Sequence, residues 1–340
     1  MTHGRRVTVS TGSRLHFGLL THRPKSGREF GGLGVMIDSP GWTVAASASD
    51  SLADSAEDRI VVADSAAAAN PETERRVCSF IKQIRRDRDA SGPSLDINVS
   101  KAIPSHRGLG SGTQLALATA RAVNVCLNQD DVSASGLAAL TGRGVRSAVG
   151  TWGFDSGGLI VDGGKLESDS VGSLAARLDF PNDWRFVLIF PQSFSGLSGD
   201  DEITAFRDLP GMPQATTDAL CRLTVMEILP AVQDRDFGRV SAAFEEYGHR
   251  AGEYFAPAQG GVFIDPRMED FGRLLAENGI EGFAQTSWGP TCAALCRNDE
   301  MAHQAVEIIN SSAEASHYQL AIARPLNCGA AVEISASSGT

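Results

Sequence analysis

The sequence predicts a two-domain protein in which helices and strands are mixed. With 340 residues the chain is long enough to bury a large core, and its composition is ordinary for a globular protein. Alternating apolar segments typical of strands and apolar residues at helical spacing occur in both halves of the chain. We expect a division in the stretch 165–179, which gives domains of residues 1–170 and 171–340.

A glycine-rich loop at 104–114, with the sequence PSHRGLGSGTQ, is the segment around which the prediction is organised. It follows an alternating strand at 94–100 and leads into a helical pattern at 115–127. The first N–H groups of a helix lack internal partners, and the helix dipole puts partial positive charge there. The loop is therefore expected to bind phosphate or diphosphate. The residues assigned to this role are Arg107, Gly108, Leu109, Gly110, Ser111, Gly112 and Thr113.

Other interpretations of this loop are weaker. It could be a glycine-rich turn in which Ser111 or Thr113 only caps the helix. It is not a Walker loop, because no Gly-Lys-Ser/Thr occurs, and it lacks the third glycine of the dinucleotide fingerprint.

Strands come first in the N-terminal half. A strand at 6–10 precedes the extended segment 13–20, in which Arg14 and His16 share one face. A glycine turn and strand at 30–38 follow, and Gly31 and Gly32 would allow close backbone approach to a ligand. The other elements expected before the loop are strands at 42–46 and 59–63 and an amphipathic helix at 72–88.

Arg143 and Arg146 form a second unusual feature in the segment 142–150. On a helical turn, residues three apart share a face, so two guanidinium groups could bind one phosphate or carboxylate. Surface salt bridges explain the pair equally well. The segment 153–164 then predicts a turn, a strand and a tight hairpin in which Asp162 is a turn residue.

The C-terminal half opens with a continuous apolar strand at 184–190, as expected in a sheet that is covered on both faces. A loop at 254–261 contains Gln259, and a Gly/Ser-rich turn at 287–290 joins two short strands. The remaining elements expected are helices near 215–232, 237–253, 265–278 and 303–309 and a last strand at 318–324.

Composition excludes several classes of function. The net charge of −11 argues against general binding of nucleic acid or anionic membranes. The six cysteines form no Cys-x-x-Cys pair, so we expect neither zinc nor disulfides and a reducing compartment. No signal-like apolar segment follows the first residues and no apolar run could span a bilayer, so a cytoplasmic location is expected.

Taken together, the glycine-rich segments resemble the GHMP superfamily of small-molecule kinases and their relatives. The segment 104–112 is similar to the phosphate-binding motif of that superfamily, and 287–290 lies where its third motif is expected. Within it the chain most resembles the β-ribofuranosylaminobenzene 5′-phosphate synthase branch. The strings that carry this likeness lie at 13–20, 30–34, 108–114, 142–147, 157–164, 196–199, 254–261 and 287–291.

The resemblance implies an α+β fold with two domains: an N-terminal βαβ domain with an unusual crossover and a ferredoxin-like C-terminal domain. It implies that 4-aminobenzoate condenses with 5-phosphoribosyl 1-diphosphate, releasing CO2 and pyrophosphate, for a methanopterin-type carrier. Mg²⁺ bound with the diphosphate, no organic cofactor and a homodimer are expected.

Candidate site residues follow from the same resemblance. Arg14, His16, Arg143 and Arg146 are candidates for the 5′-phosphate and the aminobenzoate carboxylate, without an assignment between them. The further pocket candidates are Gly31, Gly32, Gln259, Ser287, Trp288 and Gly289.

Two alternatives remain at this point, namely an ATP-dependent kinase of the same superfamily and a phosphate-ligand sensor without catalysis. Many GHMP kinases carry an aspartate seven residues before a Gly-Gly pair, where it orients or deprotonates the acceptor hydroxyl. In this sequence that position is Gly150, and the nearest acid, Asp155, lies only two residues before the pair. The sequence therefore favours the synthase over the kinase.

Overall fold

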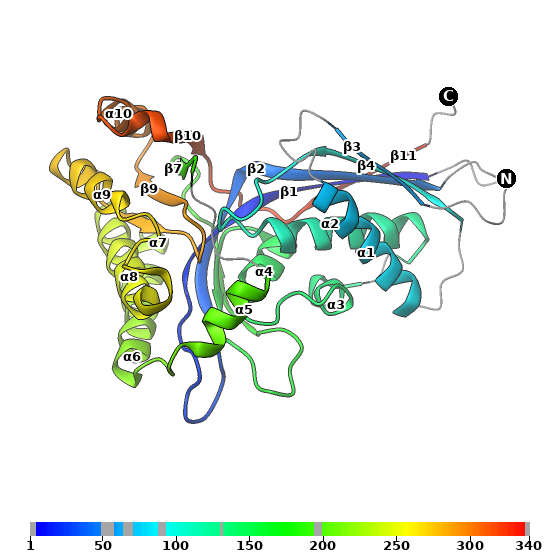
Figure 1. The fold of residues 1–340 in the computed structure, drawn as a ribbon, viewed down its shortest axis with the longest axis horizontal. Helices are drawn as coiled ribbons and strands as arrows, with labels where there is room; N and C mark the ends of the chain where they lie inside the picture. The colour runs from blue at the N-terminus through cyan, green and yellow to red at the C-terminus, as the bar shows by residue number, and fades with distance from the viewer. Residues whose placement is uncertain are drawn as a thin grey trace.

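Two β-sheets organise the chain in the computed structural model, which describes residues 5–48, 58–63, 71–87, 93–129, 132–193 and 199–336. The first sheet and its helices form one part of the molecule, and the second sheet with the later helices forms the other (Figure 1). Residues 196–198 of the matching string at 196–199 lie outside the described residues. No helix of the described part is long and apolar enough to cross a membrane.

The first sheet is built on a long antiparallel pair, β1 (Arg5–Gly18) and β2 (Gly32–Ala48). Its main order is β11-β1-β2-β4-β3, and β5 and β6 extend it from β2. The other strands are β3 (Arg59–Val62), β4 (Leu95–Lys101), β5 (Leu159–Asp162), β6 (Leu174–Leu178) and β11 (Ala331–Ala336). Strands β3 and β4 are parallel and joined through α1 (Pro71–Asp87), which gives the βαβ unit.

Strands β6 and β11 both belong to this first sheet although they follow residue 170. β6 pairs with β5, and β11 pairs with the start of β1. The first sheet therefore contains residues from both sides of the expected division at residue 170. The chain leaves the first sheet after β6 and returns to it at β11. The tight hairpin predicted at 162–164 is wrong, because β5 and β6 are separated by the residues between Asp162 and Leu174.

Helices α1, α2 (Ser111–Cys126), α3 (Ala134–Leu140) and α4 (Val149–Ser156) lie on one face of the first sheet (Figure 1). Helix α2 packs on β1 and β2, and small residues such as Ala116, Ala118 and Ala120 on its fully buried faces permit a close approach. The helix begins at Ser111, four residues earlier than predicted, so the end of the glycine-rich loop is its first turn.

The segment 142–148 does not form the helical turn on which Arg143 and Arg146 would share a face. The chain bends there before α4 begins at Val149, because Gly142 and Gly144 have φ of 64° and 77°, in the left-handed region that a helix excludes. Arg143 and Arg146 consequently do not share a helix face.

The second sheet has the order β10-β7-β9-β8 and is antiparallel throughout. Its strands are β7 (Arg185–Pro191), β8 (Phe283–Gln285), β9 (Cys292–Cys296) and β10 (Tyr318–Ala323). Helix α8 (Phe237–Gln259) connects the first two strands, and α10 (Asp299–Asn310) connects the last two. This is the expected ferredoxin-like arrangement.

Additional helical segments follow β7 and α8. They are α5 (Gly199–Asp208), α6 (Gln214–Arg222), a π-helical segment (Leu223–Ile228), α7 (Leu229–Gln233), α9 (Arg267–Glu277) and a short 3-10 turn (Ala315–His317).

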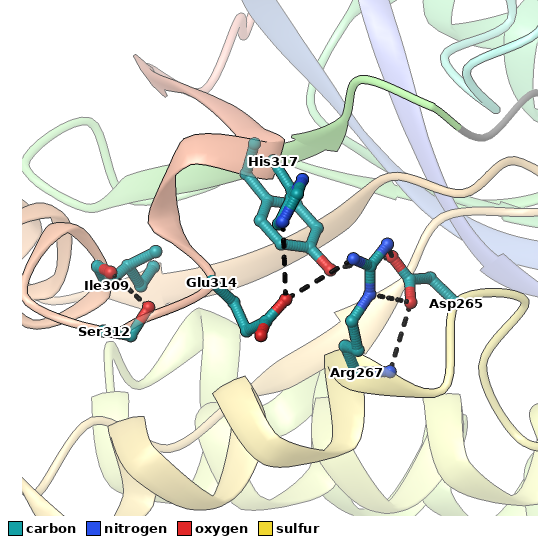
Figure 2. A network of polar contacts seen from close by, with 7 residues as sticks. Asp265, Arg267, Ile309, Ser312, Glu314 and His317 are labelled. Carbon is teal, nitrogen blue, oxygen red and sulfur yellow. Dashed lines mark hydrogen bonds and ion pairs between the residues drawn. The ribbon is translucent and has the colours of Figure 1, made fainter.

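A buried carboxylate fastens α9 to β10. Asp265 is fully buried and accepts hydrogen bonds from Arg267 at 2.9 and 3.0 Å and from the Tyr318 hydroxyl at 2.8 Å. Burial opposes ionisation of Asp265, but the hydrogen bonds from Arg267 and Tyr318 outweigh it and lower its pKa. Figure 2 shows that Glu314 and His317 extend the network on the side of β10.

Replacing Asp265 with Asn should lower the free energy of unfolding by about 2–4 kcal/mol, the scale expected when a buried, charged hydrogen-bonding partner is lost. Urea titration measures it. The matched control is Asp270→Asn, because Asp270 pairs with Arg273 on the same helix but both side chains are about two-thirds exposed. An equal loss in both variants would contradict a special role for the buried carboxylate.

Candidate active site

A cavity of about 640 Å³ lies between the two sheets. It brings together most of the residues that the sequence singled out. From that set it is lined by Arg14, His16, Arg107, Gly108, Leu109, Gly110, Ser111, Gly112, Thr113, Arg143, Arg146, Gln259, Ser287, Trp288 and Gly289.

Gly31 and Gly32 do not line the cavity. A Cβ on Gly32 would lie 2.7 Å from His16 Nε2, and one on Gly31 would lie 2.8 Å from the Asp162 carbonyl oxygen. These glycines therefore make room for protein groups behind the cavity wall, and the expectation that they face a ligand is corrected.

The N-terminus of α2 forms the floor of one end of the cavity. Gly110 precedes the helix with φ of 72°, and no side chain caps it. Ser111 differs from the expectation, because its hydroxyl donates to the Ile103 carbonyl at 3.1 Å and is thereby directed into the core. The first backbone N–H groups of the helix, more than the Ser111 hydroxyl, are the donors that an anion would meet here.

Three arginines surround this helix end. The Arg14 side chain lies against Gly110 and donates from Nη1 to the Gly108 carbonyl at 3.1 Å. A Cβ on Gly112 would lie 2.4 Å from Arg76 Nη2 and 3.6 Å from Arg143 Nη1. Guanidinium groups and helix N–H groups thus converge on one place, which suits a diphosphate. We call this place, formed by the start of α2 with Arg14, Arg76 and Arg143, the phosphate cradle.

Arg76 was missed by the sequence reasoning, which treated the helix that carries it as an amphipathic element only. Burial lowers its pKa, and Glu72 one turn earlier opposes that shift. Glu72 lies 3.9 Å from Arg76 and 3.5 Å from His106 Nε2. The only available signal was a charged residue between apolar positions, one turn before Phe80.

The cavity is strongly basic although the protein is acidic. Five arginines line it, and Glu72 is the only acidic residue among the described lining residues. Burial lowers the pKa of Arg107, whose Nη1 hydrogen-bonds the Pro191 carbonyl, so this arginine also ties the glycine-rich loop to the end of β7. Such a concentration of positive charge favours an anionic ligand.

The glycine-rich loop and the 287–290 turn are interlocked. A Cβ on Gly289 would lie 2.1 Å from the Gly108 nitrogen, and one on Gly108 would lie 2.2 Å from the Thr286 carbonyl oxygen. The buried Thr286 hydroxyl donates to the Gly108 carbonyl at 3.0 Å and accepts from the His16 N–H at 3.0 Å. Thr286, which sequence reasoning did not single out, therefore joins three segments that are far apart in the chain.

Aromatic side chains form the other end of the cavity. Trp288 packs against Phe206 of α5 and Phe255 of α8, with ring centroids 4.9 and 5.1 Å apart. The Arg146 guanidinium lies over the Phe206 ring, 5.0 Å from its centroid. An apolar wall with a cation above it suits a planar aromatic anion.

Gln259 lines the cavity but its amide is engaged in the protein. Its Nε2 donates to the carbonyls of Gly261 and Val262 at 2.9 and 2.8 Å, and its Oε1 accepts from Gln285 at 3.2 Å. Its position is consistent with a role in holding the 259–262 turn.

Comparison with known proteins agrees with this geometry. Residues 75–156 match the family model described as the GHMP kinases N terminal domain. The fold is similar to homoserine kinase from Cytophaga hutchinsonii, with a TM-score of 0.66, 16% identity and coverage of 98% of each chain. It is also similar to mevalonate diphosphate decarboxylase from Staphylococcus aureus, with a TM-score of 0.68, 14% identity and coverage of 97% and 98%.

Residues 75–156 are thus similar to the N-terminal domain of the GHMP kinases, and the whole chain has the same overall fold as these two enzymes. Among curated proteins it is similar to three archaeal proteins named beta-ribofuranosylphenol 5'-phosphate synthase. Identity is 29% to the Methanothermobacter thermautotrophicus protein, covering 84% of this chain and 87% of the relative. The Methanocaldococcus jannaschii protein is 28% identical (72% and 78%), and the Archaeoglobus fulgidus protein is 29% identical (85% and 87%).

The position at which many GHMP kinases carry an aspartate is occupied here by Gly150. Its Cα lies against Thr113 and Gln114, and its carbonyl accepts from Gln114 Nε2 at 2.8 Å. Asp155 borders a different hollow, beside β11. Neither position supplies the cavity with a carboxylate that could deprotonate an acceptor hydroxyl.

Side chains that could bind a metal ion are sparse around the cavity. Within the described ranges no cluster of three or more His, Cys, Asp or Glu residues could hold a metal ion. Mg²⁺ is commonly held by one or two carboxylates together with substrate phosphates. Glu72 is the lining carboxylate that could serve a magnesium ion arriving with a diphosphate.

The interlock of the two loops predicts a sensitive position. Replacing Gly289 with Ala should separate the loops, destabilise the protein by about 1–3 kcal/mol, the usual scale of overpacking, and weaken phosphate binding. Thermal unfolding and calorimetric titration with pyrophosphate measure the two effects. Gly238→Ala is the control, since a Cβ at this helical position meets nothing closer than 3.8 Å. Unchanged pyrophosphate affinity in Gly289→Ala would show that the interlock does not shape the cradle.

Proposed function

We propose that this protein transfers the 5-phosphoribosyl group of 5-phosphoribosyl 1-diphosphate to a ring carbon of a para-substituted benzoate, releasing diphosphate and CO2. The observation that carries the proposal is one cavity with an arginine-rich helix N-terminus at one end and an aromatic wall at the other. Its volume of about 640 Å³ suits two small molecules side by side. The three named synthases among its relatives support the same reaction.

The acceptor is the part of the proposal in which the resemblance and the relatives' names differ. The resemblance implies 4-aminobenzoate, whereas the relatives' printed name gives a ribofuranosylphenol, whose matching acceptor is 4-hydroxybenzoate. Both carry an electron-donating group para to the carboxylate. The same cavity chemistry therefore serves either, and the assay must include both.

The bond changes balance without a nucleophilic side chain. The ring carbon that bears the carboxylate attacks the anomeric carbon as the bond to the diphosphate oxygen breaks. The bond between the ring carbon and the carboxylate carbon then breaks. CO2 leaves, and the electron pair of the broken bond restores the aromaticity of the ring. The N–H groups at the start of α2, with Arg14, Arg76 and Arg143, would stabilise the charge on the departing diphosphate. A magnesium ion bound to the diphosphate, with Glu72 nearby, would neutralise further charge when present.

The decisive experiment uses purified protein with carboxyl-labelled 4-aminobenzoate or 4-hydroxybenzoate, with and without 5-phosphoribosyl 1-diphosphate, across Mg²⁺ concentrations. Labelled CO2 should appear only when both substrates are present. A parallel screen follows ATP consumption with homoserine, mevalonate and galactose. Folded protein that releases no CO2 but turns over an alcohol at about 1 s⁻¹ or faster would establish the kinase instead.

We expect the two arginines of the 142–147 segment to bind different substrates. Arg143 lies near Gly112 at the cradle, and Arg146 lies over Phe206 at the aromatic wall. Arg146→Lys should raise KM for the benzoate by about tenfold or more and leave KM for the diphosphate substrate nearly unchanged, while Arg143→Lys should do the reverse. Lysine keeps the charge but cannot reproduce a bidentate or stacked guanidinium, a loss of about 1–3 kcal/mol.

Steady-state kinetics with one substrate varied at a time measures this split. Arg239→Lys is the control, because Arg239 is about three-quarters exposed on α8. If both cavity variants changed the same KM, the assignment of the two ends would be wrong.

A further inference from the structure

A buried carboxylate and a serine lie behind His16, which is in the cavity wall. Asp162, at the end of β5, is 1% exposed and accepts from the N–H groups of Ala148 and Gly164 at 2.6 and 2.9 Å. The neighbouring Ser147 side chain also favours the ionised form of this carboxylate and so lowers its pKa. The Ser147 hydroxyl oxygen lies 3.0 Å from His16 Nε2. Asp162 thus keeps its expected role as a turn residue through the bond from Gly164, and it also anchors the segment before α4 through the bond from Ala148.

Counting the protons of these three side chains fixes the state of the imidazole. Burial raises the pKa of Asp162, but two backbone N–H bonds and the nearby Ser147 favour its ionised form, which can only accept. We infer that the single Ser147 proton is directed to this carboxylate, which leaves the Ser147 oxygen to accept from His16. Nε2 therefore carries the proton, and Nδ1 has a lone pair.

His16 Nδ1 is the unusual atom of the site. It is buried and has no hydrogen-bond partner among the described residues. Burial, and then the positive charge of Arg14, lower the pKa of His16 well below its ordinary value, so the ring stays neutral near pH 7. A buried acceptor without a partner is costly, which indicates that a ligand completes it.

We propose that His16, oriented by Ser147 and Asp162, uses Nδ1 to accept a hydrogen bond from an O–H or N–H group of the substrate. The other charged side chains of the cavity are almost all donors, and Glu72 already faces Arg76 and His106. A substrate hydroxyl or amino group therefore has His16 as its natural partner. The identity of that group, though not the tautomer, rests on the proposed function.

The position of His16 suits this role. On β1 it is two residues beyond Arg14, which lies at the cradle, and its carbonyl accepts from the Ser287 N–H at 2.6 Å beside Trp288. His16 thus stands between the phosphate end and the aromatic end. Two substrate groups share the required chemistry: a ribose hydroxyl, and the para hydroxyl or amino group of the benzoate. In the second case the hydrogen bond would strengthen electron donation to the attacking ring carbon.

Gly32 explains how the imidazole is held. A Cβ at Gly32 would lie 2.7 Å from His16 Nε2 and 3.2 Å from Cε1, so the ring packs directly on the β2 backbone. The sheet on one side and Ser147 on the other leave the ring one orientation.

The test uses two variants that keep different halves of the imidazole. The amide of Asn can reach the Nδ1 position, whereas the amide of Gln reaches the Nε2 position near Ser147. If Nδ1 is the functional atom, His16→Gln should weaken binding of one substrate by about tenfold, and His16→Asn should retain more of it. Calorimetric titrations with ribose 5-phosphate, 4-hydroxybenzoate, 4-aminobenzoate and unsubstituted benzoate identify the source. Circular dichroism confirms that both variants fold.

The titrations distinguish the two substrate groups that His16 could bind. Weakened binding of ribose 5-phosphate alone assigns the ribose hydroxyl, and weakened binding of the para-substituted benzoates, with benzoate unchanged, assigns the arene. Nitrogen-15 spectra of the histidine-labelled protein should show His16 protonated at Nε2, and Ser147→Ala should change that signal. A proton on Nδ1, or unchanged affinities in a folded His16→Gln variant, would overturn the proposal. Because binding and tautomer are read without turnover, they stand apart from failure of the synthase assay.

Discussion

The contact between Gly108 and Gly289 is the constraint on which the rest of the site depends. The two backbones lie so close that a single Cβ on either would overlap the other. Thr286 joins the pair to β1 through His16. Since Gly108 belongs to the loop beside the first sheet and Gly289 to the turn between β8 and β9, this contact sets the distance between the phosphate cradle and the aromatic wall. Glycine is required at both positions by space, and at Gly108 also by its φ of 76°.

The distribution of charge follows from the same construction. A chain with net charge −11 gathers five arginines around one cavity, and each comes from an element that the fold already fixes. Arg14 is on β1, Arg76 is on α1, and Arg107 is in the glycine-rich loop. The net negative charge of the whole chain opposes binding of polyanions, whereas the local cluster of arginines favours a small anion in the cavity.

The sequence predicted the elements whose signals are local. The glycine-rich loop, its flanking strand and its helix were found because the pattern and the function occupy one stretch of about 30 residues. The turn at 287–290 and the candidate arginines were also found, and the structure places them on one cavity. The boundaries of α2 and the bend at 142–148 were missed, because helix starts and left-handed glycines depend on the surrounding packing.

Contacts between residues that are far apart in the chain could not be predicted from the sequence. Arg76 meets Gly112, Thr286 meets Gly108, and Asp162 reaches His16 through Ser147. In each case the partner is tens to hundreds of residues away, so no spacing rule connects them. Phe206 and Phe255 were not recognised either, since an aromatic residue on a helix is most often a core residue, and only the position of Trp288 gives these two a role.

These cross-fold contacts also show how a kinase fold can serve a different transfer. Many kinases that transfer a phosphoryl group to an alcohol place a carboxylate beside the acceptor hydroxyl. The position that supplies it in many GHMP kinases is Gly150 in this chain, where the carbonyl accepts from Gln114 of α2. A ribosyl transfer to an arene carbon has no hydroxyl to deprotonate, but it must steady a departing diphosphate and an electron-rich ring. In the proposed reaction the arginines at α2 would meet the first need, and the aromatic wall with a neutral His16 would meet the second. Asp162 lies outside the cavity, behind Ser147 and His16, where we propose that it orients a hydrogen-bond acceptor instead of removing a proton.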